Sequence, residues 1–187
     1  MQKWILQPND NWPDPPDPVP RVAVELEVEK NVLQVHWNIQ ESQATFRAEV
    51  LEDGGPCWQD SCVEIFLKHL DDPDIYSNFE FNSKGFCLAA IGPDRHSRKI
   101  RGSSDLCKIL RKCHIEDREE QRISWTLSIS IPLDLIGASS SVSTPNVYGN
   151  IYKCGDKSSK PHWLRLFPIG TPIPDFHRPE FFGLLNP

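Results

Sequence analysis

The sequence lacks any hydrophobic run that approaches the ~20 apolar residues needed to cross a bilayer, so we expect no membrane span. Its first twenty residues contain no apolar segment behind basic residues, which predicts that no secretory signal peptide is present. Where such a signal is missing, a reducing compartment such as the cytoplasm is favoured.

An excess of basic residues is also missing. The chain has 20 Lys and Arg residues against 26 Asp and Glu residues, which gives a formal net charge of -6 at pH 7. Binding nucleic acid without regard to sequence requires a basic surface that neutralises phosphates. The charge balance argues against this function, and we expect no nucleic-acid partner.

Ligand patterns for haem, zinc and EF-hand calcium are missing as well. Haem usually takes an axial His or Met, but the one methionine is Met1 and the histidines share no ligand spacing. The six cysteines form no C-x-x-C pair, which favours buried thiols over a zinc or redox motif. Asp71, Asp72 and Asp74 offer oxygen ligands, but their Asp-Asp-Pro-Asp segment is typical of a turn and does not fit an EF-hand loop. From these residues alone we expect no cofactor.

Proline, by contrast, is abundant, at 17 of 187 residues where about 5% is average. Proline removes a backbone donor and interrupts helices, so its abundance beside nine Phe and six Trp residues favours strands joined by rigid loops. A chain of 187 residues is long enough for one full core, whereas two cores would be cramped. We therefore predict a proline-rich N-terminal arm over residues 1–20 and a single all-β domain over residues 21–187.

Alternating apolar and polar residues predict a series of short strands. Short strands with proline-bearing loops are typical of a two-sheet β-sandwich. Apolar residues from Leu106 to Cys113 follow i, i+3, i+4, i+7 spacing, which predicts one short helix with Ser104 as its N-cap. A Ser/Gly/Pro loop is expected over residues 137–146. The predicted strands cover residues 21–29, 32–39, 58–68, 75–82, 86–91, 125–131, 150–154, 163–167 and 181–185.

Two of these strands, 58–68 and 75–82, agree on which side carries polar residues. Because successive side chains on a strand point to opposite sides, pairing these strands would turn one apolar face to the core and leave one solvated polar face. An indole beside carboxylates and amides suits a sugar, whose ring stacks on an aromatic plate and whose hydroxyls need donors and acceptors. The expected core side consists of Val63, Ile65, Leu67, Phe79 and Phe81, and the polar side of Trp58, Glu64, Asn78, Glu80 and Asn82.

Two arginines are candidate donors beside these carboxylates. Arg95 and Arg98 follow the strand at 86–91, and a guanidinium fork matches vicinal hydroxyls geometrically. Solvated loop charges are the alternative interpretation of this pair. In the same way, apolar and polar residues alternate in any sheet with one solvated side, whether or not that side binds a ligand. Trp58 could also fold back onto the core.

Six ordered motifs along the chain carry a resemblance to a known family. They are residues 58–67 (WQDSCVEIFL), 76–82 (YSNFEFN), 131–133 (IPL), 149–156 (GNIYKCGD), 161–164 (PHWL) and 174–183 (PDFHRPEFFG). Together they resemble the family 9 carbohydrate-binding modules and their bacterial relatives over about residues 20–187. The resemblance implies a β-sandwich of jelly-roll type, often attached to xylan-degrading enzymes and sometimes carrying structural calcium.

The resemblance also implies roles for individual residues. In the best-understood members a sugar lies between two tryptophans, and a glutamate shortly after the first accepts hydrogen bonds from hydroxyls. By motif position Trp58 resembles that first tryptophan and Glu64 resembles that glutamate. The relatives carry the second tryptophan where this chain reads Arg-Leu-Phe at residues 165–167, with Leu166 at the expected position. Trp163 has the opposite strand parity and is the candidate second wall.

The hypothesis from the sequence is a non-catalytic module that holds a sugar end against Trp58, with a carbohydrate ligand and a glycoside hydrolase as partners. An enzyme is the first alternative, because Glu64 and Glu80 on adjacent strands could meet the ~5–9.5 Å carboxyl spacing of glycosidases. No nucleophile elbow or Ser-His-Asp signature supports it. A sandwich that has lost sugar binding and presents a protein-interaction surface is the second alternative, motivated by the altered segment at 165–167.

Overall fold

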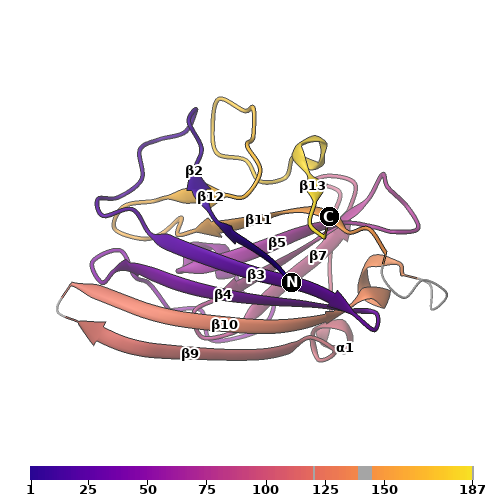
Figure 1. Cartoon of the computed structure of the whole chain (residues 1–187), viewed down its shortest axis with the longest axis horizontal. Helices are drawn as coiled ribbons and strands as arrows, with labels where there is room; N and C mark the ends of the chain where they lie inside the picture. Colours follow the sequence, from indigo (N-terminus) through magenta and orange to yellow (C-terminus); the bar gives the residue numbers. More distant parts are fainter. Residues whose placement is uncertain (120, 139–144, 187) are drawn as a thin grey trace.

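Two antiparallel sheets pack face to face in the structure, a computed structural model that describes residues 1–119, 121–138 and 145–186 (Figure 1). The five-stranded sheet has the order β1 (Gln2–Ile5), β3 (Arg21–Glu29), β4 (Val32–Ser42), β10 (Arg122–Pro132), β9 (Leu110–Glu119). The eight-stranded sheet has the order β2 (Gln7–Pro8), β12 (Trp163–Arg165), β11 (Tyr148–Cys154), β5 (Cys62–Lys68), β6 (Tyr76–Asn82), β7 (Cys87–Gly92), β8 (Lys99–Ile100), and β13 (Gly183–Leu184) pairs with β11. The predicted all-β sandwich is confirmed.

Short helical turns connect the strands. They are η1 (Cys57–Gln59), α1 (Ser103–Leu106), η2 (Leu133–Ile136) and η3 (Pro179–Phe181). The strand predicted from residue 58 therefore begins only at Cys62, because η1 places Trp58 in a turn ahead of β5. Residues 139–144 of the loop predicted at 137–146 lie outside the described residues.

The helix predicted over 104–113 is wrong beyond its first turn. The helix α1 ends at Leu106, its N-cap is Gly102 and not Ser104, and Leu110 already belongs to β9. The side chain of Leu110 is 69% exposed, whereas Cys113 lies opposite Leu127 and packs on the core. Pairing of β9 with residues 122–130 of β10 satisfies the backbone of this segment, so the tertiary environment outweighs the local helical spacing.

The core between the sheets is apolar, and it contains the side chains that the alternation assigned to it. Val63, Ile65 and Leu67 of β5 and Phe79 and Phe81 of β6 are fully buried there. They face residues such as Trp37, Ile39, Trp125 and Leu127 from the other sheet. The strands β5 and β6 pair in the register that places Val63 opposite Phe81 and Ile65 opposite Phe79.

The other side of the eight-stranded sheet is not solvated, which corrects the expectation of an open polar face. A second apolar cluster built on Phe66, Tyr76, Tyr152 and Phe176 covers it. The segment after β12 and the proline-rich residues 9–20 supply this cover, and Figure 1 shows both on the side of the eight-stranded sheet that faces away from β9 and β10. Trp12 of that N-terminal segment is buried, and its indole donates to the carbonyl of Thr171 at 3.0 Å.

Segment 1–20 also joins both sheets directly. Its first strand, β1, pairs with β3, and β2 pairs with β12. The side chain of Asn9 accepts a hydrogen bond from the backbone of Ile169 and donates one to the carbonyl of the same residue. The segment therefore helps to place the loops that form the cover.

Candidate functional site

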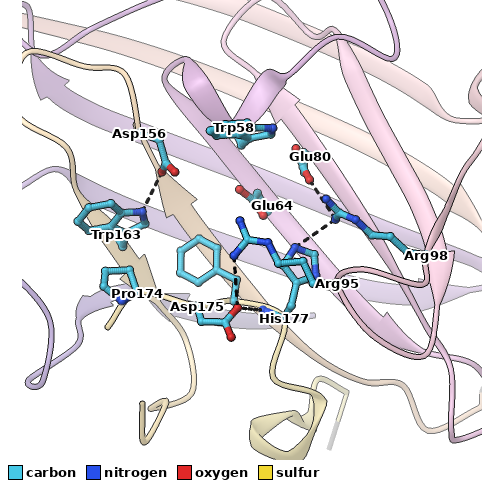
Figure 2. A pocket seen from close by; sticks show the side chains of 11 residues that line it. Trp58, Glu64, Glu80, Arg95, Arg98, Asp156, Trp163, Pro174, Asp175 and His177 are labelled. Atoms are coloured by element: carbon cyan, nitrogen blue, oxygen red, sulfur yellow. Dashed lines mark hydrogen bonds and ion pairs between the residues drawn. The ribbon is translucent and has the colours of Figure 1, made fainter. Parts of the chain in front are cut away.

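A pocket of about 120 Å³ opens within this cover, on the outer side of the eight-stranded sheet (Figure 2). The strands β5 and β6 supply its floor, and its walls come from η1, the β7–β8 loop, β12 and the segment before η3. The residues that line it are Trp58, Glu64, Glu80, Arg95, Arg98, Asp156, Trp163, Pro174, Asp175, Phe176 and His177.

Glu64 and Glu80 form the floor. The strand register places them directly opposite each other, and they are only 3% and 2% exposed. Burial, and after it the neighbouring Glu80, raises the pKa of Glu64 well above its usual range. Burial also raises the pKa of Glu80 to about 7, although the charge of Arg98 opposes this shift. Near neutral pH the floor therefore retains carboxyl protons, so it can donate as well as accept hydrogen bonds.

Arg98 reaches the floor from the β7–β8 loop. Its Nη1 donates to Asn78 Oδ1 and to His177 Nε2, both at 3.1 Å, and it lies 3.7 Å from Glu80 Oε1. Because a guanidinium cannot accept, His177 accepts at Nε2, and its Nδ1 donates to the Tyr76 hydroxyl at 2.7 Å. Burial, followed by the charge of Arg98, lowers the pKa of His177 to about 2, so the imidazole is neutral. These contacts hold the guanidinium in one orientation beside Glu80.

Two indoles form walls of the pocket, and Asp156 connects them. The backbone N–H of Asp156 donates to the Trp58 carbonyl at 3.3 Å, and its Oδ1 accepts from Trp163 Nε1 at 2.8 Å. Burial raises the pKa of Asp156. Both indoles are half-buried, and Figure 2 shows them on different sides of the pocket with Asp156 between them. Trp58 therefore does not fold back into the core between the sheets.

The outer rim of the pocket carries a looser ion pair. Arg95 is 55% exposed, and its Nη1 lies 3.8 Å from Asp175 Oδ1. That same oxygen accepts from the backbone N–H of His177 at 3.1 Å, which fixes the turn before η3. An exposed pair at this distance contributes little to stability, so Arg95 remains free to contact a ligand.

The pocket brings together most of the residues that the sequence singled out. Trp58, Glu64, Glu80, Arg95, Arg98 and Trp163 all line it. Asn78 stands behind this lining, where its Oδ1 accepts from Arg98 and its Nδ2 donates to Glu80 at 3.0 Å.

Asn82 does not belong to this group. Its Nδ2 donates to the Val50 carbonyl and to Asp60, and its Oδ1 accepts from the backbone of Lys84 and Phe86. The side chain therefore fixes the turn after β6, which corrects its assignment to the polar floor. Its strand parity is right, but its place at the strand end puts it beyond the pocket.

Sequence reasoning missed Asp156, Asp175 and His177 as pocket residues. All three lie in two of the motifs that carry the resemblance to family 9 modules, at residues 149–156 and 174–183. They lie on loops, for which no strand periodicity predicts where a side chain points. Leu166, at the position of the expected second tryptophan, packs on the core, and Trp163 takes a place in the pocket wall.

No helix among the described residues is long and apolar enough to cross a membrane. A β-sandwich whose pocket combines indoles, carboxyls and guanidinium groups has the form of a carbohydrate-binding module. The sequence profile of carbohydrate-binding family 9 matches residues 3–187, so the chain belongs to this family.

A solved structure from Bacteroides uniformis ATCC 8492, of a presumed carbohydrate-binding protein, is similar to this chain. The two sequences are 31% identical, with a TM-score of 0.85, and the match covers 98% of this chain and 85% of the other. None of the curated proteins matches the chain.

Proposed function

We propose that the pocket binds one sugar residue at the end of a glycan without cleaving it. The observation that carries this proposal is the convergence of two half-buried indoles, two opposed carboxyls and a fixed guanidinium in one pocket. Trp58 stacks on the apolar face of the sugar ring, and Trp163 forms the second wall. The small volume of the pocket and the loops around it favour a terminal residue over the interior of a chain.

The polar groups match the hydroxyls of a sugar. Each hydroxyl donates one hydrogen bond and accepts others, so it needs acceptors and donors at fixed positions. Glu64 and Glu80 offer carboxyl oxygens, and Arg98 offers N–H groups whose direction is set by Asn78 and His177. Groups that are already held in place lose little conformational entropy on binding, which favours affinity.

Titration calorimetry with glucose, xylose, cellobiose and xylobiose tests this proposal, with tryptophan fluorescence as a second readout. We expect saturable binding at millimolar concentrations or below, with affinity reduced at least tenfold in Trp58→Ala. Trp4→Ala is the matched control, because Trp4 is also partly exposed but lies on β1, outside the pocket. No heat and no spectral change across these sugars would contradict the proposal and favour a protein-interaction surface.

The opposed carboxyls also favour a second candidate, glycoside hydrolysis. Glycosidases place their two carboxyls on either side of the scissile bond. Glu64 and Glu80 extend from adjacent strands of one floor and approach a ligand from the same side, which argues for binding. Release of reducing ends from xylobiose or cellobiose, abolished in Glu80→Gln, would favour hydrolysis instead. A glycoside hydrolase as partner stays a prediction from the family resemblance.

A further inference from the structure

Two cysteines and a glutamate gather directly beneath the sugar pocket. Cys62 on β5 and Cys154 on β11 are opposite each other in the strand register. Glu64 lies two residues after Cys62, so it extends from the same side of the sheet. The ligand atoms of the three side chains lie within 4.8 Å of one another, and Cys154 Sγ is 2.9 Å from Glu64 Oε1.

No other group of three His, Cys, Asp or Glu side chains gathers this closely in the part of the chain that the structure describes. All three members are at most 3% exposed. Glu64 alone also lines the pocket, so it connects the group to the opening. The thiol of Cys154 lies 3.5 Å from the Trp58 carbonyl, a further oxygen at the edge of the group.

The chemistry of these donors suits zinc. Thiolates are soft ligands that select zinc or copper(I), whereas calcium takes oxygen ligands only. Zinc bonds of ~2.3 Å to sulfur and ~2.0–2.2 Å to oxygen place neighbouring ligand atoms of a tetrahedron roughly 3.5–3.8 Å apart. Atoms already within 4.8 Å reach that spacing by small side-chain movements. The donor set does not fit the calcium that the family resemblance implies, which stays a prediction for another position.

We propose that Cys62, Cys154 and Glu64 bind one zinc ion, with the fourth coordination position facing the pocket. On binding, the two S–H bonds and the O–H bond of protonated Glu64 break, two Zn–S bonds and one Zn–O bond form, and the three protons pass to solvent, so no oxidant or reductant is consumed. Three protein ligands with one open position are the arrangement in which zinc keeps a water or takes a ligand oxygen. Glu64 belongs both to the metal group and to the pocket floor, but the metal is tested without any sugar present, so failure of one proposal is distinguishable from failure of the other.

Titration of the reduced full-length chain with Co²⁺ tests this site, because Co²⁺ substitutes for zinc and reports thiolate ligands by charge-transfer absorption. We expect one equivalent to produce a sulfur-to-cobalt band that Zn²⁺ then removes. Cys62→Ser and Cys154→Ser are expected to lower the affinity for Co²⁺ at least tenfold. Cys57→Ser is the matched control, since Cys57 is a buried thiol whose Sγ instead bonds to the Phe86 carbonyl.

A second measurement needs no variant and covers the case in which a serine variant fails to fold. Alkylation of the wild-type thiols, read by peptide mass mapping, is expected to slow at least tenfold at Cys62 and Cys154 when Zn²⁺ is present. The rate at exposed Cys107 is expected to stay unchanged. Absence of the cobalt band, protection at Cys107 as strong as at the pair, or a Cys62–Cys154 disulfide that persists in reductant would each overturn the proposal.

Discussion

The outer faces of the two sheets have the same alternating pattern in the sequence, yet they meet different environments. On the five-stranded sheet, Gln34, Asn38 and Gln40 of β4 are exposed. On the eight-stranded sheet, Asn78 and Glu80 of β6 are buried beneath the loops. Alternation therefore shows which side of a strand faces the core, and it does not show whether the other side is covered.

The difference indicates where function lies. Burying a polar group costs free energy unless it is hydrogen-bonded, so a covered polar face must be satisfied internally or by a ligand. Asn78 is satisfied by Arg98 and Glu80, but Glu80 Oε2 is buried without a protein partner. That unpaired oxygen lies on a residue of the pocket floor, where a sugar hydroxyl can donate to it.

The largest expected effect is on the free energy of unfolding, and it compares a residue of the apolar core with one on the solvated face. Phe81→Ala is expected to lower the free energy of unfolding by about 3–5 kcal/mol, because it leaves a cavity between the sheets. Gln34→Ala, on the exposed side of β4, is expected to change it by less than about 0.5 kcal/mol. Urea denaturation measures both, and a shift for Phe81→Ala no larger than that for Gln34→Ala would show that the core assignment is inverted.

The second effect is also on the free energy of unfolding, and it compares an asparagine on the covered polar face with an asparagine on the exposed one. Asn78→Ala is expected to cost about 1–3 kcal/mol, because Arg98 and Glu80 each lose a buried hydrogen-bond partner. Asn38→Ala is expected to cost less than about 0.5 kcal/mol, because Asn38 is exposed. Equal costs in urea denaturation would mean that the loops do not cover the eight-stranded sheet.

The third effect depends on pH and concerns His162. Burial, followed by the charge of Lys153, lowers the pKa of His162 to about 3, well below the usual value of about 6.5. At acidic pH the unfolded chain therefore binds a proton at His162 that the folded chain does not bind. The contribution of neutral His162 to the free energy of unfolding is present above about pH 6.5 and is lost as the pH falls towards 3. Between pH 7 and pH 5.5 the loss is expected to be about 1.3 kcal/mol.

His162→Gln serves as the reference for this measurement. The difference in unfolding free energy between wild type and variant isolates the contribution of His162 from carboxyl groups that titrate in the same range. A difference that does not change between pH 7 and pH 5.5 would contradict a neutral, buried imidazole.

The smallest expected effect compares the two arginines of the pocket. Arg98→Ala is expected to weaken sugar binding at least tenfold, because Arg98 is 21% exposed and held by Asn78 and His177. Arg95→Ala is expected to weaken sugar binding less than about threefold, because an exposed charge at the rim contributes little. Calorimetry with the sugar that binds wild type most tightly compares the affinities of the two variants. A larger loss of affinity for Arg95→Ala than for Arg98→Ala would place the sugar at the rim.

Much of this arrangement could be predicted from the sequence. Period-two alternation in β3, β4, β5, β6 and β10 correctly predicts a sandwich and its core side. The strand parity of Glu64 and Glu80 predicts that they lie together. The helix over Leu110 to Cys113 fails because pairing with β10 overrides local spacing. Asp156, Asp175 and His177 could not be placed, because loop side chains are oriented by contacts with distant segments.

The six tryptophans make it possible to test whether the covered pocket holds the sugar between Trp58 and Trp163. Trp37 and Trp125 are fully buried in the core and serve as internal references. Indole N–H resonances, assigned by single Trp→Phe substitutions, are followed by NMR during sugar titration. We expect saturable shifts at Trp58 and Trp163, with the signals of Trp37 and Trp125 unchanged. Saturable binding that leaves the Trp58 and Trp163 signals in place would contradict it.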